Sequence, residues 1–156
     1  MQTAEYATMF RVEETHWWYS ALHRLVFQAL EAELPDWQDK QILDVGCGTG
    51  AILKRLGNPE RNVGIDLAPE AISFCRQRGL DNVRQGDICA LPFKDASFDA
   101  VICSSVLHHG WVRDVTSAIR ELHRVLRAGG LLLLNVPVFR CALSPIQRRH
   151  PLQWRS

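Results

Sequence analysis

The sequence predicts an α/β domain built around a doubly wound parallel sheet. Short apolar segments alternate with segments of helical periodicity between residues 41 and 136. Most of the apolar segments are continuous rather than interrupted by polar residues, which is typical of strands that helices cover on both faces. The 156 residues are enough for one such domain with a sizeable core.

The elements of this fold can be placed in order along the chain. Residues 1–12 are interpreted as a loose lead-in, and residues 13–34 as a helix that ends before Pro35. Gly129 and Gly130 are expected to cap the last helix. The predicted strands cover residues 41–45, 62–66, 82–85, 98–104 and 131–136, and the predicted helices between them cover residues 49–56, 69–78 and 112–126.

Charge, hydropathy and cysteine content disfavour several classes of protein. The net charge is +1, so no general attraction to nucleic acid or to anionic membranes is expected. No apolar run approaches the roughly 18 residues of a membrane span, and the first residues lack the pattern of a secretory signal. The five cysteines include no CxxC pair. We therefore expect no disulfide framework, no metal site and a cytoplasmic location.

A glycine-rich segment, "ILDVGCGTG", follows the first strand and indicates a ligand that approaches bare backbone. Its glycines are Gly46, Gly48 and Gly50, a tighter spacing than the GxGxxG of dinucleotide sites. Asp44 stands two residues before the first glycine, where its charge would repel a pyrophosphate. S-adenosylmethionine carries an ammonium and a sulfonium and no phosphate, so the charge favours this cofactor over NAD.

Two further acids follow the second and third predicted strands. Asp66 comes 20 residues after Gly46, a position suited to accept hydrogen bonds from ribose hydroxyls, which both cofactors carry. Leu67 beside it is expected to pack on the adenine. Asp87, with its neighbour Ile88, is suited to the adenine amino group. The alternative for these acids is a solvated loop position or a helix cap.

Four segments in order resemble the class I S-adenosylmethionine-dependent methyltransferases of the small-molecule, type 11 kind: "ILDVGCGTG", "GIDLAPEAI", "GDICALPFKDASFDAVICSSVLHH" and "ELHRVLRAGGLLLLNVP". The resemblance covers about residues 40–137. It implies a Rossmann-like core, S-adenosylmethionine as cofactor and a small-molecule acceptor. By position it assigns the methionine end to Asp44, Gly46, Cys47, Gly48, Gly50, Ser104 and Ser105, and the ribose and adenine to Asp66, Leu67, Asp87 and Ile88.

Two segments are candidates for the acceptor side. His108 and His109 lie in the loop after the fourth strand, and an imidazole titrates near neutral pH and can act as a base. Alternatively, one histidine packs beside the cofactor and the other caps the next helix. Trp17 and Trp18, in "HWWY", form either a lid over the acceptor or part of the core. The sequence does not decide between these alternatives.

The resemblance divides the chain into an N-terminal helical cap (1–40), a cofactor-binding core (41–137) and a basic tail (138–156). Family members have seven strands, whereas the tail shows no hairpin pattern. The predicted order is therefore 3-2-1-4-5, with the fifth strand at an edge that either the tail or a homodimer partner covers. Two rival functions remain: a methyltransferase-like module that binds cofactor with little turnover, and a nicotinamide-dependent oxidoreductase.

Overall fold

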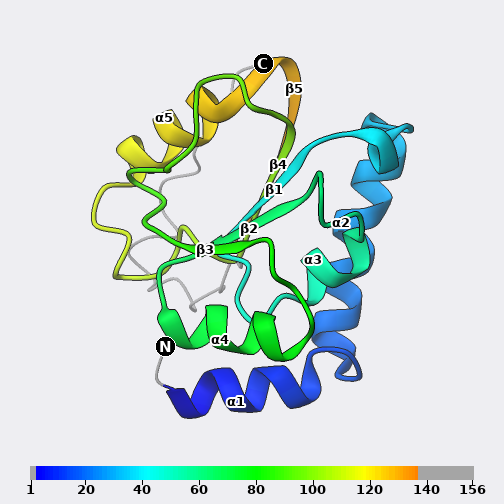
Figure 1. Cartoon of the computed structure of the whole chain (residues 1–156), viewed down its shortest axis with the longest axis vertical. Helices are drawn as coiled ribbons and strands as arrows, with labels where there is room; N and C mark the ends of the chain where they lie inside the picture. Colours follow the sequence, from blue (N-terminus) through cyan, green and yellow to red (C-terminus); the bar gives the residue numbers. More distant parts are fainter. Residues whose placement is uncertain (1–2, 137–156) are drawn as a thin grey trace, which may run out of the picture.

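A computed structural model describes residues 3–136 and shows five parallel strands (Figure 1). The strand order is β3-β2-β1-β4-β5, which confirms the predicted fold class and order. β1 pairs with both β2 and β4, so the winding direction reverses at β1. The strands are β1 (Ile42–Val45), β2 (Val63–Asp66), β3 (Val83–Gln85), β4 (Phe98–Ser104) and β5 (Leu126–Asn135).

Helices cover both faces of the sheet, because successive strand residues point to opposite faces. Ile42 packs in a cluster with residues of α2, α3 and α4, whereas Leu43 packs in a cluster with residues of α5. A loop segment after β3 also covers the second face, through the buried Leu91. The helices are α1 (Thr3–Val12), α2 (Trp17–Glu33), α3 (Ala51–Leu56), α4 (Pro69–Gln77) and α5 (Val115–Val125), with a short 3₁₀ turn at Trp37–Asp39.

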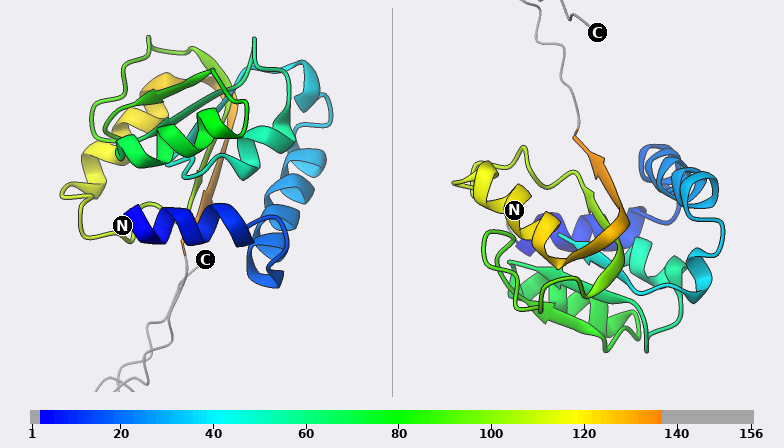
Figure 2. Two further views of the ribbon diagram at one scale, coloured as in Figure 1. Left: turned by 60° about the horizontal axis from the view of Figure 1, so that its bottom comes forward. Right: turned by 90° about the horizontal axis from the view of Figure 1, so that it is seen from above.

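The interpretation of residues 1–12 as a loose lead-in is wrong for residues 3–12, which form α1. A helix of ten residues is marginal in isolation, so tertiary contacts stabilise it. Phe10 packs on Phe74 of α4, with ring centroids 5.1 Å apart, and Tyr6 is buried. Figure 2 shows α1 running alongside α4 and joining α2. The next helix begins at Trp17 rather than at residue 13, and the His16 side chain caps it.

The predicted helix cap at Gly129 and Gly130 is also wrong. α5 ends at Val125, and β5 begins at once with Leu126 opposite Phe98. The glycines lie inside the strand, where the pairing register shifts and Gly129 has a φ of +75°. A side chain at Gly130 would come within 2.8 Å of the Asp99 carbonyl oxygen. The pair therefore forms a bulge, which is the other common use of glycine in a strand.

Candidate functional site

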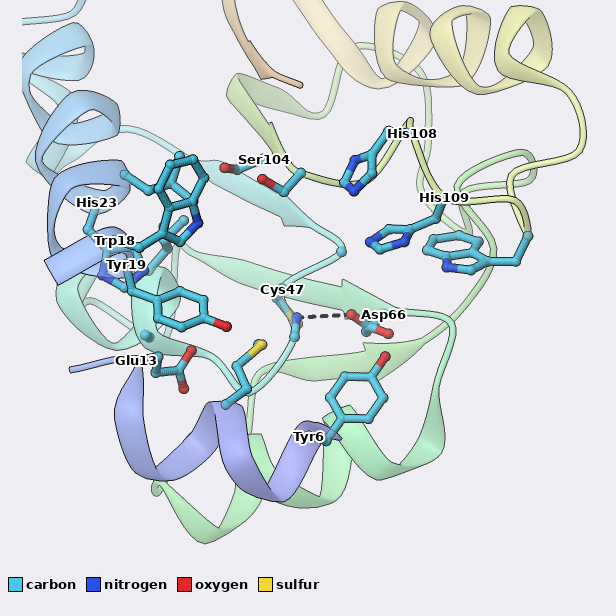
Figure 3. A pocket seen from close by; sticks show the side chains of 18 residues that line it. Tyr6, Glu13, Trp18, Tyr19, His23, Cys47, Asp66, Ser104, His108 and His109 are labelled. Atoms are coloured by element: carbon cyan, nitrogen blue, oxygen red, sulfur yellow. Dashed lines mark hydrogen bonds between the residues drawn. The ribbon is translucent and has the colours of Figure 1, made fainter. Parts of the chain in front are cut away.

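A cavity of about 510 Å³ lies where the winding of the sheet reverses, at the carboxyl ends of β1, β2 and β4. Ligands of open parallel sheets bind at this position. Three parts of the chain line it, and one of them is the loop after β4 with His108 and His109 (Figure 3). We call the glycine loop (46–50), together with the strand-end acids Asp44 and Asp66, the floor. We call α1, the junction at residues 13–16 and the start of α2 the cover.

The glycine loop brings bare backbone to the cavity through Gly46 and Gly48. Both have positive φ values, +72° and +54°, in the region that side chains disfavour. A Cβ atom at Gly46 would lie 2.2 Å from a methyl carbon of Val106, and one at Gly48 would lie 2.4 Å from Cε of Met9. A side chain would clash at these two positions, so glycine leaves the backbone bare there, as the predicted close approach of a ligand requires. Gly50 caps α3 instead and does not line the cavity.

Asp66 faces the cavity from the end of β2 and is held in place by the backbone. Its Oδ2 accepts a hydrogen bond from the Gly48 amide and its Oδ1 accepts one from the Ala68 amide, both at 2.9 Å (Figure 3). The hydroxyl of the Tyr6 side chain points toward it (Figure 3). Burial raises the pKa of Asp66, and the two amides partly oppose this shift. A hydroxyl-bearing ligand would find a fixed carboxylate here.

Asp44 is the penultimate residue of β1, two residues before the first glycine of the loop, and is only 2% exposed. Its Oδ2 has no hydrogen-bond partner among the described residues. Burial, reinforced by the charges of Asp66 and Glu13, raises the pKa of Asp44 to about 7. Asp44 does not line the cavity, so its charge would act on a ligand through the electrostatic field and not by direct contact.

The cavity combines carboxylates with an absence of strong cations. Glu13 and Asp66 line it, whereas no lysine or arginine within residues 3–136 does. The groups in its lining that can carry a positive charge are His23, His108 and His109. A buried pyrophosphate normally requires basic side chains or a helix N-terminus. The first residues of the short helix α3 also line the cavity, but two carboxylates and no lysine or arginine of the described residues line it, so the lining favours a ligand that carries positive charge.

Ser104, the last residue of β4, lines the cavity, as do Ser105 and the two histidines His108 and His109 in the loop that follows. The Ser104 hydroxyl is buried without a partner among the described residues, and Ser105 has a φ of +60°. The His108 and His109 rings lie 4.2 Å apart, and His109 stacks on Trp111 at 5.7 Å. Burial and the neighbouring His108 lower the pKa of His109, which keeps its imidazole neutral and able to accept a proton at pH 7.

Three of the predicted adenine residues do not line the cavity. Leu67 is 38% exposed, and Ile88 is buried in the core. The carboxylate of the exposed Asp87 accepts a hydrogen bond from the Cys89 amide at 2.8 Å, a turn contact within its own loop. Their role in binding adenine stays a prediction. Cys47, by contrast, lines the cavity, and its Sγ lies 3.9 Å from that of Cys75.

The sequence interpretation missed most of the cover. Tyr6, Met9 and Glu13 line the cavity, and their three- and four-residue spacing places them on one face of a helical segment. This spacing is the sequence signal from which that helical segment could have been predicted. His23 of α2 also lines the cavity. Trp18 lines it too and is 47% exposed, so it is not part of the core.

Comparison with known proteins identifies the family. A family model described as a methyltransferase domain matches residues 43–134, more than half of the chain. The chain belongs to this family. The methyltransferase domain covers all five strands except the first residue of β1 and the last residue of β5, and it includes the glycine loop and both strand-end acids. α1 and α2 lie outside the matched region.

Relatives of this methyltransferase domain include two curated proteins and a solved structure. The malonyl-(acyl-carrier protein) O-methyltransferase of Pectobacterium atrosepticum is 35% identical over 73% of this chain and 45% of its own length. The fatty-acid O-methyltransferase of Mycolicibacterium smegmatis is 42% identical over 63% of this chain and 37% of its own length. A solved structure of a SAM-dependent methyltransferase from Thermotoga maritima, a possible histamine N-methyltransferase, aligns over 83% of this chain and 56% of its own. The TM-score is 0.61 and the sequence identity is 27%. The chain spans less than half the length of both curated relatives.

The described residues also bear on the expectations about membranes and metals. No helix there is long and apolar enough to cross a membrane. No group of three or more histidine, cysteine or acidic residues there is arranged to hold a metal ion. The cysteines at positions 47, 75, 89 and 103 are free thiols. Cys141, the predicted tail and the last residue of the predicted core lie outside the described residues.

Proposed function

We propose that the cavity binds S-adenosylmethionine and that the chain transfers its methyl group to a small-molecule acceptor. The observation that carries this proposal is the charge of the floor: Asp66 lines the cavity, Asp44 is buried beside the loop, and no lysine or arginine of the described residues lines it. A sulfonium and an ammonium would stabilise these carboxylates in their ionised form, whereas a pyrophosphate would be repelled by them.

The residues present fit this cofactor group by group. We propose that Asp66 accepts hydrogen bonds from the ribose hydroxyls, since it is fixed and faces the cavity. The methionine moiety would lie over Gly46, Cys47 and Gly48. Ser104, whose buried hydroxyl has no partner within residues 3–136, would bind its polar end. Leu67, Asp87, Ile88, Ser105 and Gly50 complete the proposed site on the strength of the family resemblance.

When bound, the cofactor supplies an activated methyl group for in-line displacement by the acceptor. The chain would position the acceptor, exclude water and remove a proton where the acceptor atom carries one. We propose His109 as that base, because its lowered pKa keeps the ring unprotonated and its packing between His108 and Trp111 fixes the ring. Both curated relatives are named as O-methyltransferases, so we expect an oxygen acceptor.

Product formation tests this function directly. The chain is incubated with S-adenosylmethionine and a panel of fatty acids, acyl thioesters and phenols, and S-adenosylhomocysteine is measured. Acceptor-dependent product that His109→Ala abolishes would support the proposal. Tight cofactor binding without product from any acceptor would favour the binding module instead, a rival that the short span of the chain keeps open.

We also propose a cytoplasmic location, where the thiols of the protein stay reduced.

The edge of β5 is the proposed site of self-association. Leu134 is 47% exposed and Val136 is 39% exposed, and no described strand pairs with the outer side of β5. An apolar edge of this kind pairs readily with another chain. We expect the protein to sediment as a homodimer and Leu134→Lys to yield monomers. A wild-type protein that sediments as a monomer would mean that the edge is covered in another way.

A further inference from the structure

A buried ion pair beside the cavity joins the cover to the floor. Arg78 ends α4, and its side chain is 6% exposed. Its guanidinium donates hydrogen bonds to the carboxylates of Glu13 and Glu14, which lie between α1 and α2. The Glu13 side chain is 3% exposed, whereas that of Glu14 is 49% exposed and also pairs with Lys54. The pair between Arg78 and Glu13 is therefore the desolvated one.

The same guanidinium also contacts α1 and the glycine loop. Arg78 Nε donates to the Thr49 carbonyl oxygen at 2.8 Å, and the Thr49 hydroxyl donates to Glu13. One terminal nitrogen lies 3.4 Å from the Phe10 carbonyl oxygen, and the group stacks 4.5 Å from the centroid of the Phe10 ring. Arg78 itself does not line the cavity. It thus touches both parts of the site without touching the space that a ligand would fill.

α1 depends on such contacts for its position. The helix has ten residues and is joined to α2 by a short turn, so its own hydrogen bonds stabilise it only marginally. Yet it carries Tyr6, which lines the cavity together with Asp66, and Met9, which lies against Gly48. Figure 3 shows the Tyr6 side chain directed at Asp66 from α1, with Glu13 farther along the same segment. Whatever fixes α1 therefore fixes the wall opposite the proposed ribose site.

We propose that Arg78 is a positioning residue for the cofactor: through Glu13 it holds α1 closed over the glycine loop and thereby slows cofactor release. The inference rests on the proposed binding of S-adenosylmethionine. Its physical reason is the cost of a buried charge without a partner. Without Arg78, Glu13 would stay near Asp44 and Asp66 with no counter-charge, and the junction would move outward into water.

The experiment compares a matched set of full-length variants. Glu13→Gln removes the charge of the buried acid and keeps its shape, and Glu14→Gln makes the same change one residue along, where the acid is exposed. Arg78→Ala removes the guanidinium, and Arg78→Lys keeps only its charge. For each, the dissociation rate of S-adenosylhomocysteine is measured by stopped flow, and amide hydrogen exchange is followed in residues 3–12 and in β1 and β4.

We expect Arg78→Ala and Glu13→Gln to release S-adenosylhomocysteine about tenfold faster, the effect of losing one charge-assisted contact. Exchange in residues 3–12 should rise while β1 and β4 stay protected. Arg78→Lys should be intermediate, and Glu14→Gln should match the wild type, because exposed pairs contribute little. In Met9→Ala, which has already lost a contact of the cover, Arg78→Ala should have a smaller effect than in the wild type.

The proposal is overturned if folded Glu13→Gln and Arg78→Ala release the ligand at the wild-type rate, even when their melting temperatures fall. Should Arg78→Ala fail to fold, Glu13→Gln and Arg78→Lys decide the question. A wild-type chain that does not bind S-adenosylhomocysteine would refute the proposed function. The hydrogen exchange of residues 3–12 needs no ligand, so unchanged exchange in Glu13→Gln would refute the positioning role separately.

Discussion

The floor and the cover of the cavity differ in how their positions are fixed. The floor is built from the ends of β1 and β2 and from a loop whose glycines take conformations that side chains disfavour. The cover is a short helix and the start of a second one, and side-chain contacts of Arg78 and Phe10 with distant residues hold it in place. The backbone therefore determines the floor, whereas the cover depends on a few long-range contacts.

This difference predicts that the parts of the site have separate roles. The floor carries the charge that would select the cofactor, and the cover would enclose the bound cofactor. The loop after β4, with His108, His109 and Trp111, borders both and would carry the chemistry. Variants in the three regions should therefore change different measured quantities.

The largest effect is expected for the loop. His109→Ala should lower kcat by about a hundredfold or more, the usual contribution of a general base. The dissociation constant of S-adenosylhomocysteine should stay at the wild-type value. His108→Ala is the matched control, with a smaller loss. If His108→Ala proves the more damaging change, the base is the other histidine, and if neither slows transfer, the reaction needs no base.

The next effect is expected for the floor. Asp66→Ala should weaken the binding of S-adenosylhomocysteine by about 2 kcal/mol, because it removes charge-assisted hydrogen bonds to the ribose. Asp81→Ala, at an exposed aspartate outside the cavity, should bind as tightly as the wild type. Calorimetry on both variants checks this prediction. Equal affinities would mean that the ribose lies away from β2.

The effect of the cover should be smaller and should concern the acceptor. Trp18 lines the cavity and is 47% exposed, whereas Trp17 is 71% exposed and lies outside it. Trp18→Ala should raise the acceptor KM severalfold, with little change in melting temperature, because no core contact is lost. Trp17→Ala should leave KM unchanged. A large fall in melting temperature for Trp18→Ala would instead indicate a packing role.

The smallest effect is a pH dependence that originates in the floor. The pKa of Asp44 is about 7 in the free protein, and a bound cation would lower it. Binding then favours the deprotonated acid, so affinity for S-adenosylmethionine should rise from pH 6 to pH 8 by at most about tenfold in all, with most of the rise below pH 7. S-adenosylhomocysteine, whose sulfur is neutral, should show a shallower slope. An Asp44→Asn variant with an undiminished slope would assign the titration to another group, such as Asp66.

The floor could be predicted from the sequence because local rules determine it. Continuous apolar strands gave the parallel sheet, and the acids and glycines at the strand ends gave the site within a few residues. Gly129 and Gly130 misled because glycine serves both helix caps and strand bulges, and only pairing with β4 distinguishes the two. α1 was missed because its helical state depends on contacts with Phe74 and Arg78, more than 60 residues away.

The central claim is that the acids of the floor select a cationic adenosine ligand without phosphate. Calorimetric titration of the wild-type chain at pH 8 with S-adenosylmethionine, and separately with NADH, tests it most directly. We expect saturable binding of the sulfonium compound and no measurable heat with the dinucleotide. Tight binding of NADH together with indifference to S-adenosylmethionine would contradict the account.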